Sequence, residues 1–189
     1  MVDILHDVQA LEHSIAHFLS TLVNLEQLDA FSAEDKFSLL VTHTLAHTSM
    51  IQLHRSFASD DAVSFEKCSR AARSCIIIIK QMADQDFAFL DPIIGVSFVY
   101  LSKRFFNISS RKPCWSIVGD FLIQEMDSIE STWPFMDTGD VRNDLGTVFY
   151  ALTCLGPRFP LVGEYEVFAN PYFTHRIAQL RTSLDSENA

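Results

Sequence analysis

Apolar residues recur every three or four positions along most of the chain, which is the spacing of amphipathic helices. The clearest stretch runs from Ile4 to Leu25, where the apolar stripe is unbroken. A polar break follows at residues 29–32, and the Ser32 hydroxyl is well placed to cap the next helix. The pattern predicts helices over residues 4–25, 32–55 and 62–83, with the first two forming an antiparallel hairpin.

The third helix contains four successive isoleucines at residues 76–79. A β-branched run locally favours a strand, but the helical stripe continues on both sides of it and the preceding residues are alanine-rich. The propensity difference is well under about 1 kcal/mol per residue, so we expect the helix to persist through the run.

Helix signals continue in the second half of the chain. Asp91-Pro92 is a strong start signal for a helix over 92–107, which is apolar on nearly every side and is expected to be central and buried. Further helices are predicted over 113–131, with its acidic residues outside, and over 140–155. The fold prediction is an all-α, single-domain bundle of about six antiparallel-connected helices over 1–156. A less regular tail over 157–189 follows, with a short helix at 174–184.

Composition narrows the partners that this chain can have. With 24 acidic and 14 basic residues the net charge is −10, which disfavours direct contact with nucleic acid. No apolar run reaches the roughly 18–20 residues of a membrane helix, and no signal peptide is recognisable, so an intracellular protein is expected. The chain is 48% hydrophobic with 16 phenylalanines, which predicts apolar surface that meets a protein partner.

Six of the seven histidines lie in the first 54 residues and are arranged symmetrically about Ala30. In an antiparallel hairpin this symmetry places His17 level with His43, His13 with His47, and His6 with His54. Helical geometry argues against a metal site, because the first-helix set falls opposite the apolar stripe while the second set flanks its own stripe. We therefore expect the first set to be solvated and the second to lie at a core boundary.

Catalytic, cofactor-binding and metal-ligating residues are not predicted anywhere in the chain. The four cysteines Cys68, Cys75, Cys114 and Cys154 lack zinc spacing and are expected to be free thiols. The acidic residues Asp84, Asp86 and Asp91 cluster near a turn, where capping and solubility explain them more simply than acid–base chemistry. The alternative is a helical small-molecule-binding protein or enzyme that uses a pocket beside the 92–107 helix, near Tyr100.

Three segments carry a resemblance to a known family: THTLAHTSMIQLHRSF (42–57), KCSRAARSCIIIIKQM (67–82) and FAFLDPIIGVSFVYLSKRF (87–105). With the helix that closes on Trp133-Pro134-Phe135, they resemble the later half of the regulatory, or middle homology, region of fungal zinc binuclear cluster transcription factors. The resemblance covers roughly residues 35–135.

The resemblance implies an all-α, non-catalytic regulatory domain in the nucleus. Its partner would be a second copy, the missing part of a parent regulator, or the transcription machinery. The six-cysteine zinc cluster that reads DNA in this family is absent from the chain. We therefore expect either the carboxy-terminal piece of a larger regulator or a short paralogue, and no zinc or DNA contact is carried over. A fragmentary gene product without an independent role is a third possibility.

Overall fold

The computed structural model describes residues 2–84, 86–88, 90, 114–133 and 135–155. These residues form five α-helices and two short 3-10 helices, and no strand occurs among them. The all-α prediction is confirmed for this part of the chain. The predicted helix over 92–107 and the tail over 157–189 lie outside the described residues.

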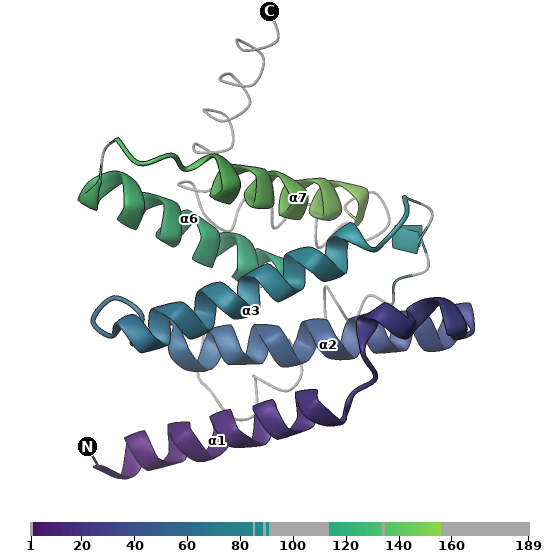
Figure 1. Cartoon of the computed structure of the whole chain (residues 1–189), viewed down its shortest axis with the longest axis horizontal. Helices are drawn as coiled ribbons and strands as arrows, with labels where there is room; N and C mark the ends of the chain where they lie inside the picture. The colour runs from purple at the N-terminus through teal and green to yellow at the C-terminus, as the bar shows by residue number, and fades with distance from the viewer. Residues whose placement is uncertain (1, 85, 89, 91–113, 134, 156–189) are drawn as a thin grey trace, which may run out of the picture.

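The helices follow the predicted order closely. Their bounds are α1 Val2–Thr21, α2 Ala33–His54, α3 Ala62–Lys80, α6 Cys114–Thr132 and α7 Gly139–Leu155. The 3-10 helices are η1 Leu25–Ala30, between α1 and α2, and η2 Asp86–Ala88, after α3. In Figure 1, α2 lies between α1 and α3, while α6 and α7 lie beyond α3.

Side-chain hydrogen bonds at Asn24 and Ser32 explain where the link between α1 and α2 begins and ends. The prediction that the first helix runs to Leu25 is wrong, because the Asn24 side chain accepts a hydrogen bond from the Glu26 amide at 3.2 Å and starts η1 instead. The predicted cap at Ser32 is confirmed, since its hydroxyl accepts a hydrogen bond from the Asp35 amide at 3.2 Å. Together these two caps set a structured link between α1 and α2 in place of a simple turn.

The core is built on α2, α3, α6 and α7. The isoleucine run is helical, as expected, and Ile76, Ile78 and Ile79 are buried in it. Large side chains that are fully buried come from all four helices: Leu40, Ile51, Ile78, Trp115, Leu122, Met126, Leu145 and Leu152. This shared core holds the four helices together as one unit.

By contrast, α1 contributes no buried side chain among its residues 6–21. The helix itself is confirmed, but its predicted stripe is only partly covered: Leu11 is 55% exposed and Phe18 is 47% exposed. Since α1 makes its main contacts with α2 alone, it is a peripheral element of the fold.

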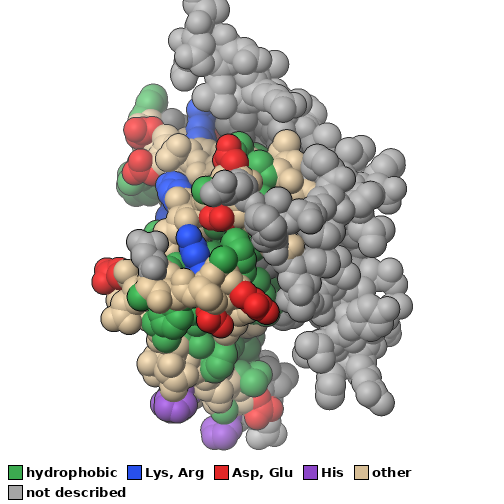
Figure 2. Space-filling view, turned by 90° about the vertical axis from the view of Figure 1, so that its right-hand side faces the viewer, with side chains coloured by type: hydrophobic (Ala, Val, Ile, Leu, Met, Phe, Trp, Pro, Cys, Tyr) green, Lys and Arg blue, Asp and Glu red, His purple; other side chains and the backbone are tan. Residues whose placement is uncertain are grey.

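No helix in the described ranges is long and apolar enough to cross a membrane. Over the described part of the face drawn in Figure 2, acidic and basic side chains are interspersed with apolar ones. Histidine side chains lie at the edge of that face.

The isoleucine run provides a matched pair for testing the core. Ile78 is 0% exposed and its neighbour Ile77 is 54% exposed. We predict that Ile78→Ala lowers the free energy of unfolding by about 2–5 kcal/mol, because it leaves a cavity. Ile77→Ala should change it by less than about 0.5 kcal/mol. Urea denaturation followed by circular dichroism measures both, and equal losses would contradict the packing of α3.

Candidate functional site

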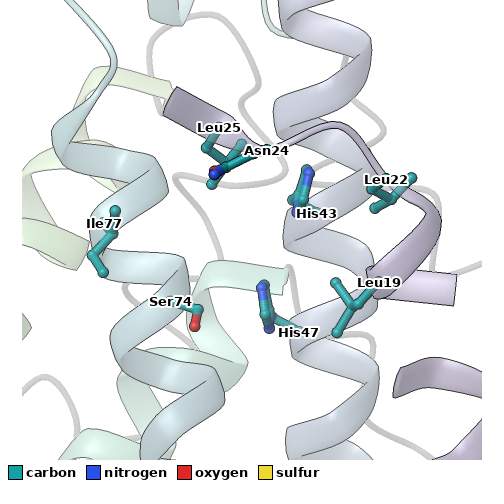
Figure 3. A pocket seen from close by; sticks show the side chains of 8 residues that line it. All are labelled: Leu19, Leu22, Asn24, Leu25, His43, His47, Ser74 and Ile77. Carbon is teal, nitrogen blue, oxygen red and sulfur yellow. The ribbon is translucent and has the colours of Figure 1, made fainter. Parts of the chain in front are cut away.

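A surface pocket of about 320 Å³ lies where α1, α2 and α3 approach one another. Figure 3 shows His43 and His47 from α2 facing Ser74 and Ile77 from α3, with the link after α1 running past them. The pocket is lined by Leu19, Leu22, Asn24, Leu25, His43, His47, Ser74 and Ile77. Its volume is at the lower end of the range for ligand sites, and Ile77 at its rim is 54% exposed, so a ligand here would stay partly in solvent.

The two pocket histidines stack on each other, with ring centroids 6.3 Å apart. His43 Nε2 lies 3.0 Å from the Val23 carbonyl oxygen and therefore donates a hydrogen bond to it. Burial, together with the neighbouring His43, lowers the pKa of His47 to about 4 from its ordinary value of 6.5. Both rings thus serve as packing groups between helices, and His47 is neutral at physiological pH.

A second polar cluster joins α1, α2 and α3. His54 Nδ1 lies 3.2 Å from the Ser64 hydroxyl, and its Nε2 lies 3.4 Å from a Glu12 carboxylate oxygen. This arrangement has the composition of a serine–histidine–carboxylate triad, but His54 is 3% exposed and Ser64 is 6% exposed. A nucleophile needs access to substrate, so burial argues for a structural role.

The charges around His54 support that structural role. Burial outweighs the attraction of Glu12 and lowers the pKa of His54, so the ring is neutral near pH 7. Glu12 also contacts the Lys67 ammonium at 2.6 Å. The ion pair between Glu12 and Lys67 therefore attaches α1 to α3, while His54 fills the space beneath it.

These contacts correct the predicted histidine alignment. Glu12, not His6, lies against His54, and the Val23 carbonyl, not His17, lies against His43. The residue numbers of both contacting pairs are centred on Ala33 and not on Ala30. The predicted alignment assumes a simple turn between the helices, whereas η1 occupies several residues there.

The expected environments of the histidines are confirmed. His6, His13 and His17 are exposed on α1, whereas His43 and His54 are buried and His47 is partly buried. Among the described residues, no three histidine, cysteine, aspartate or glutamate side chains are grouped closely enough to hold a metal ion.

The acidic turn and the cysteines also have structural surroundings. Asp86 accepts a hydrogen bond from the Ala83 amide at 2.9 Å, and Asp84 accepts one from the Tyr150 hydroxyl, while Asp91 lies outside the described residues. All four cysteines are free thiols, as expected. Burial raises the pKa of Cys68 and of Cys114 to about 11, which makes both thiols poor nucleophiles.

A partly buried ion-pair network links α3 to α6 and α7. Arg73 donates hydrogen bonds to Glu125 at 2.9 Å and to Asp144 at 2.8 Å, and the Ser69 hydroxyl donates to Glu125 at 2.8 Å. Glu125 is only 6% exposed, so the prediction that all acidic residues of this helix lie outside is wrong. Helical spacing is a signal for this burial, because Glu125 lies four residues after Phe121 and three after Leu122, on the side of these core residues.

The most exposed apolar residues of the described chain lie in the turn between α6 and α7. Trp133 is 66% exposed, Met136 is 62% exposed, and Phe135 is as accessible as in an extended peptide, at 103%. We call these three side chains the apolar turn. The composition predicts exposed apolar surface but does not locate it, and Trp133-Pro134 in the sequence indicates the end of a helix.

Comparison with known proteins found no family model that matches the chain, and no similar curated protein or solved structure.

The pKa of His47 makes stability depend on pH. Its folded-state value of about 4 lies below 6.5, so its contribution is complete above pH 6.5 and is lost as pH falls toward 4. We predict that His47→Gln reduces the acid-induced loss of unfolding free energy over this interval by up to about 3 kcal/mol. Urea titrations at pH 7 and pH 4.5 measure it, with His13→Gln on the exposed face of α1 as the control. An unchanged pH slope would contradict the burial of His47.

Arg73 and Arg70 lie on the same helix and allow a direct test of the network. Arg73→Ala leaves the buried Glu125 carboxylate without its cation, and we expect a loss of about 2–4 kcal/mol in unfolding free energy. Among the described residues Arg70 pairs with Glu66, and both side chains are exposed, so Arg70→Ala should cost less than about 0.5 kcal/mol. Chemical denaturation of both variants distinguishes the two roles, and equal effects would rule out the network as a structural element.

Proposed function

We propose that this chain is a non-catalytic interaction domain of a fungal transcription regulator that acts in the nucleus without a DNA-binding zinc cluster of its own. Its sequence segments resemble the regulatory region of that family. The observation that carries the proposal is the apolar turn, because Trp133, Phe135 and Met136 are the most exposed large apolar side chains of the described residues, and such exposed apolar patches often mark interaction sites. Tryptophan is also among the residue types that dominate binding energy at protein interfaces.

The proposed architecture is the six-helix, antiparallel-connected bundle predicted from the sequence. Paired contacts run in opposite senses along α1 and α2, from Glu12 with His54 to Val23 with His43. They do so along α2 and α3 as well, from Ser64 with His54 to Cys68 with Ile51. Along α3 and α6, by contrast, paired contacts advance in the same sense: Phe65 with Phe121, and Ser69 with Glu125. In an antiparallel-connected bundle, two helices with one helix between them in sequence run in the same direction, as α3 and α6 do.

The chemistry of the described polar clusters supports a non-catalytic role. The one serine–histidine–carboxylate arrangement noted above is buried, and the thiols at Cys68 and Cys114 are held in their unreactive form by burial. The surface pocket is lined mainly by leucines, an isoleucine and two histidines, and its rim is exposed. Binding to another protein through the apolar turn is therefore the better supported function.

A tethering experiment tests this proposal. The full chain is fused to a heterologous DNA-binding domain in yeast, and transcription of a reporter beneath its binding sites is measured. We expect the fusion to change reporter output, and Trp133→Ser/Phe135→Ser/Met136→Ser to abolish the change. Loss of such anchors weakens binding by about 2 kcal/mol or more, which is over tenfold.

The matched control replaces exposed apolar residues elsewhere: Leu11→Ser/Val63→Ser, at sites that are 55% and 57% exposed. This control should retain the reporter effect. A folded, nuclear fusion that leaves the reporter unchanged would refute the proposed function.

A further inference from the structure

We propose that the apolar turn binds a basic amphipathic segment of a protein, in which an apolar face is bordered by lysine and arginine. This inference rests on the proposed function as an interaction domain and adds the chemistry of the partner. Three observations support it: the exposed area of the turn, its hydrogen-bonded geometry and the charges around it.

The exposed area suits a small anchor. Aromatic side chains bury roughly 150–250 Å² each, so at their observed exposure the three residues of the turn offer on the order of 400 Å². A standard interface uses about 800 Å² per partner, so the turn supplies about half of one side. Methionine at position 136 adds adaptability, because its unbranched side chain fits irregular apolar surfaces.

The backbone of the turn is held by hydrogen bonds at both ends. The Trp133 amide donates to the Ile129 carbonyl at 2.8 Å, and the Met136 amide donates back to the Trp133 carbonyl at 2.9 Å. The Asp137 carboxylate then accepts a hydrogen bond from the Gly139 amide at 2.8 Å. Because these bonds hold the backbone at Trp133, Met136 and Gly139 before binding, less conformational entropy is lost when a partner covers the turn.

The charges select the partner. Residues 124–141 contain no lysine or arginine, and apart from the buried Glu125, which pairs with Arg73, they carry the carboxylates of Asp127, Glu130, Asp137 and Asp140. Asp137 and Asp140 are exposed beside the turn. The first basic residue beyond them is Arg142, which pairs with Glu130 at 3.4 Å. A basic border on the partner complements this field.

The same field disfavours two other occupants of the turn. An anionic lipid surface would be repelled by Asp137 and Asp140, although exposed aromatic residues often insert into membranes. A second copy docking through the same turn would bring the two sets of carboxylates together, in a chain whose net charge is already −10.

The two tryptophans of the chain provide the readout. Trp115 is 0% exposed and Trp133 is 66% exposed, so acrylamide quenching of fluorescence reports mainly on Trp133. The probes are two synthetic amphipathic helices of about 18 residues, five turns each, with the same leucine face and with either lysine or glutamate on the polar face. Vesicles of phosphatidylcholine and phosphatidylserine serve as the lipid probe.

We expect the lysine peptide to protect Trp133 from acrylamide and to shift its emission to the blue, while the glutamate peptide and the vesicles leave it unchanged. Phe135→Ser/Met136→Ser should weaken peptide binding by about tenfold or more. Asp137→Asn/Asp140→Asn keeps oxygen acceptors at both positions and should weaken binding several-fold, as should added salt.

Equal protection by the glutamate peptide would overturn the charge argument. Protection by vesicles would assign the turn to a lipid surface, and protection that grows with protein concentration alone would assign it to a second copy. If the reporter responds to the turn but the lysine peptide does not bind, this inference fails and the proposed function stands. If the peptide binds but the tethered chain leaves the reporter unchanged, the proposed function fails and the surface assignment stands.

Discussion

The buried carboxylate of Glu125 must be paired, and this requirement ties the two halves of the described fold together. An unpaired charge at 6% exposure would be strongly destabilising. Arg73 meets the need from α3 and also binds Asp144 on α7, so one guanidinium joins three helices. Apolar packing alone tolerates sliding between helices, whereas these charged hydrogen bonds have defined geometry. The network therefore fixes how α6 and α7 sit on α3.

The charged contacts that attach α1 to the other helices are weaker than this network. Its described side chains are all at least partly exposed, and its contacts are concentrated at two places. One is the Glu12 carboxylate beside Lys67 and His54, and the other is the link after α1, where the Val23 carbonyl accepts from His43. Because Lys67 is partly solvated, its ion pair contributes only modestly to stability. The stable frame of the described chain is thus α2, α3, α6 and α7, with α1 added at its edge.

Much of the fold was predictable because helical periodicity is a local property. The stripe through Cys75, Ile79 and Met82 identifies the inner face of α3 without any knowledge of its neighbours. The prediction of which α1 residues lie beside which α2 residues is wrong. That alignment depends on η1, which begins where the Asn24 side chain accepts a hydrogen bond from the Glu26 amide. The burial of Glu125 was missed for a different reason. A carboxylate on a helix is normally solvated. Glu125 can be buried because Arg73, on another helix, pairs with it.

The exposure of the apolar turn could not be predicted from the sequence. Trp133 and Phe135 would fit a core as readily as a surface, and composition predicts only that some apolar residues stay outside. Their exposure depends on local backbone geometry, which is held by the hydrogen bonds of the turn after α6 and by the Asp137 carboxylate, which accepts from the first amide of α7. A turn that served only to connect two helices would not need large apolar side chains. Their exposure beside the exposed carboxylates of Asp137 and Asp140 is the observation on which the proposed interaction surface rests.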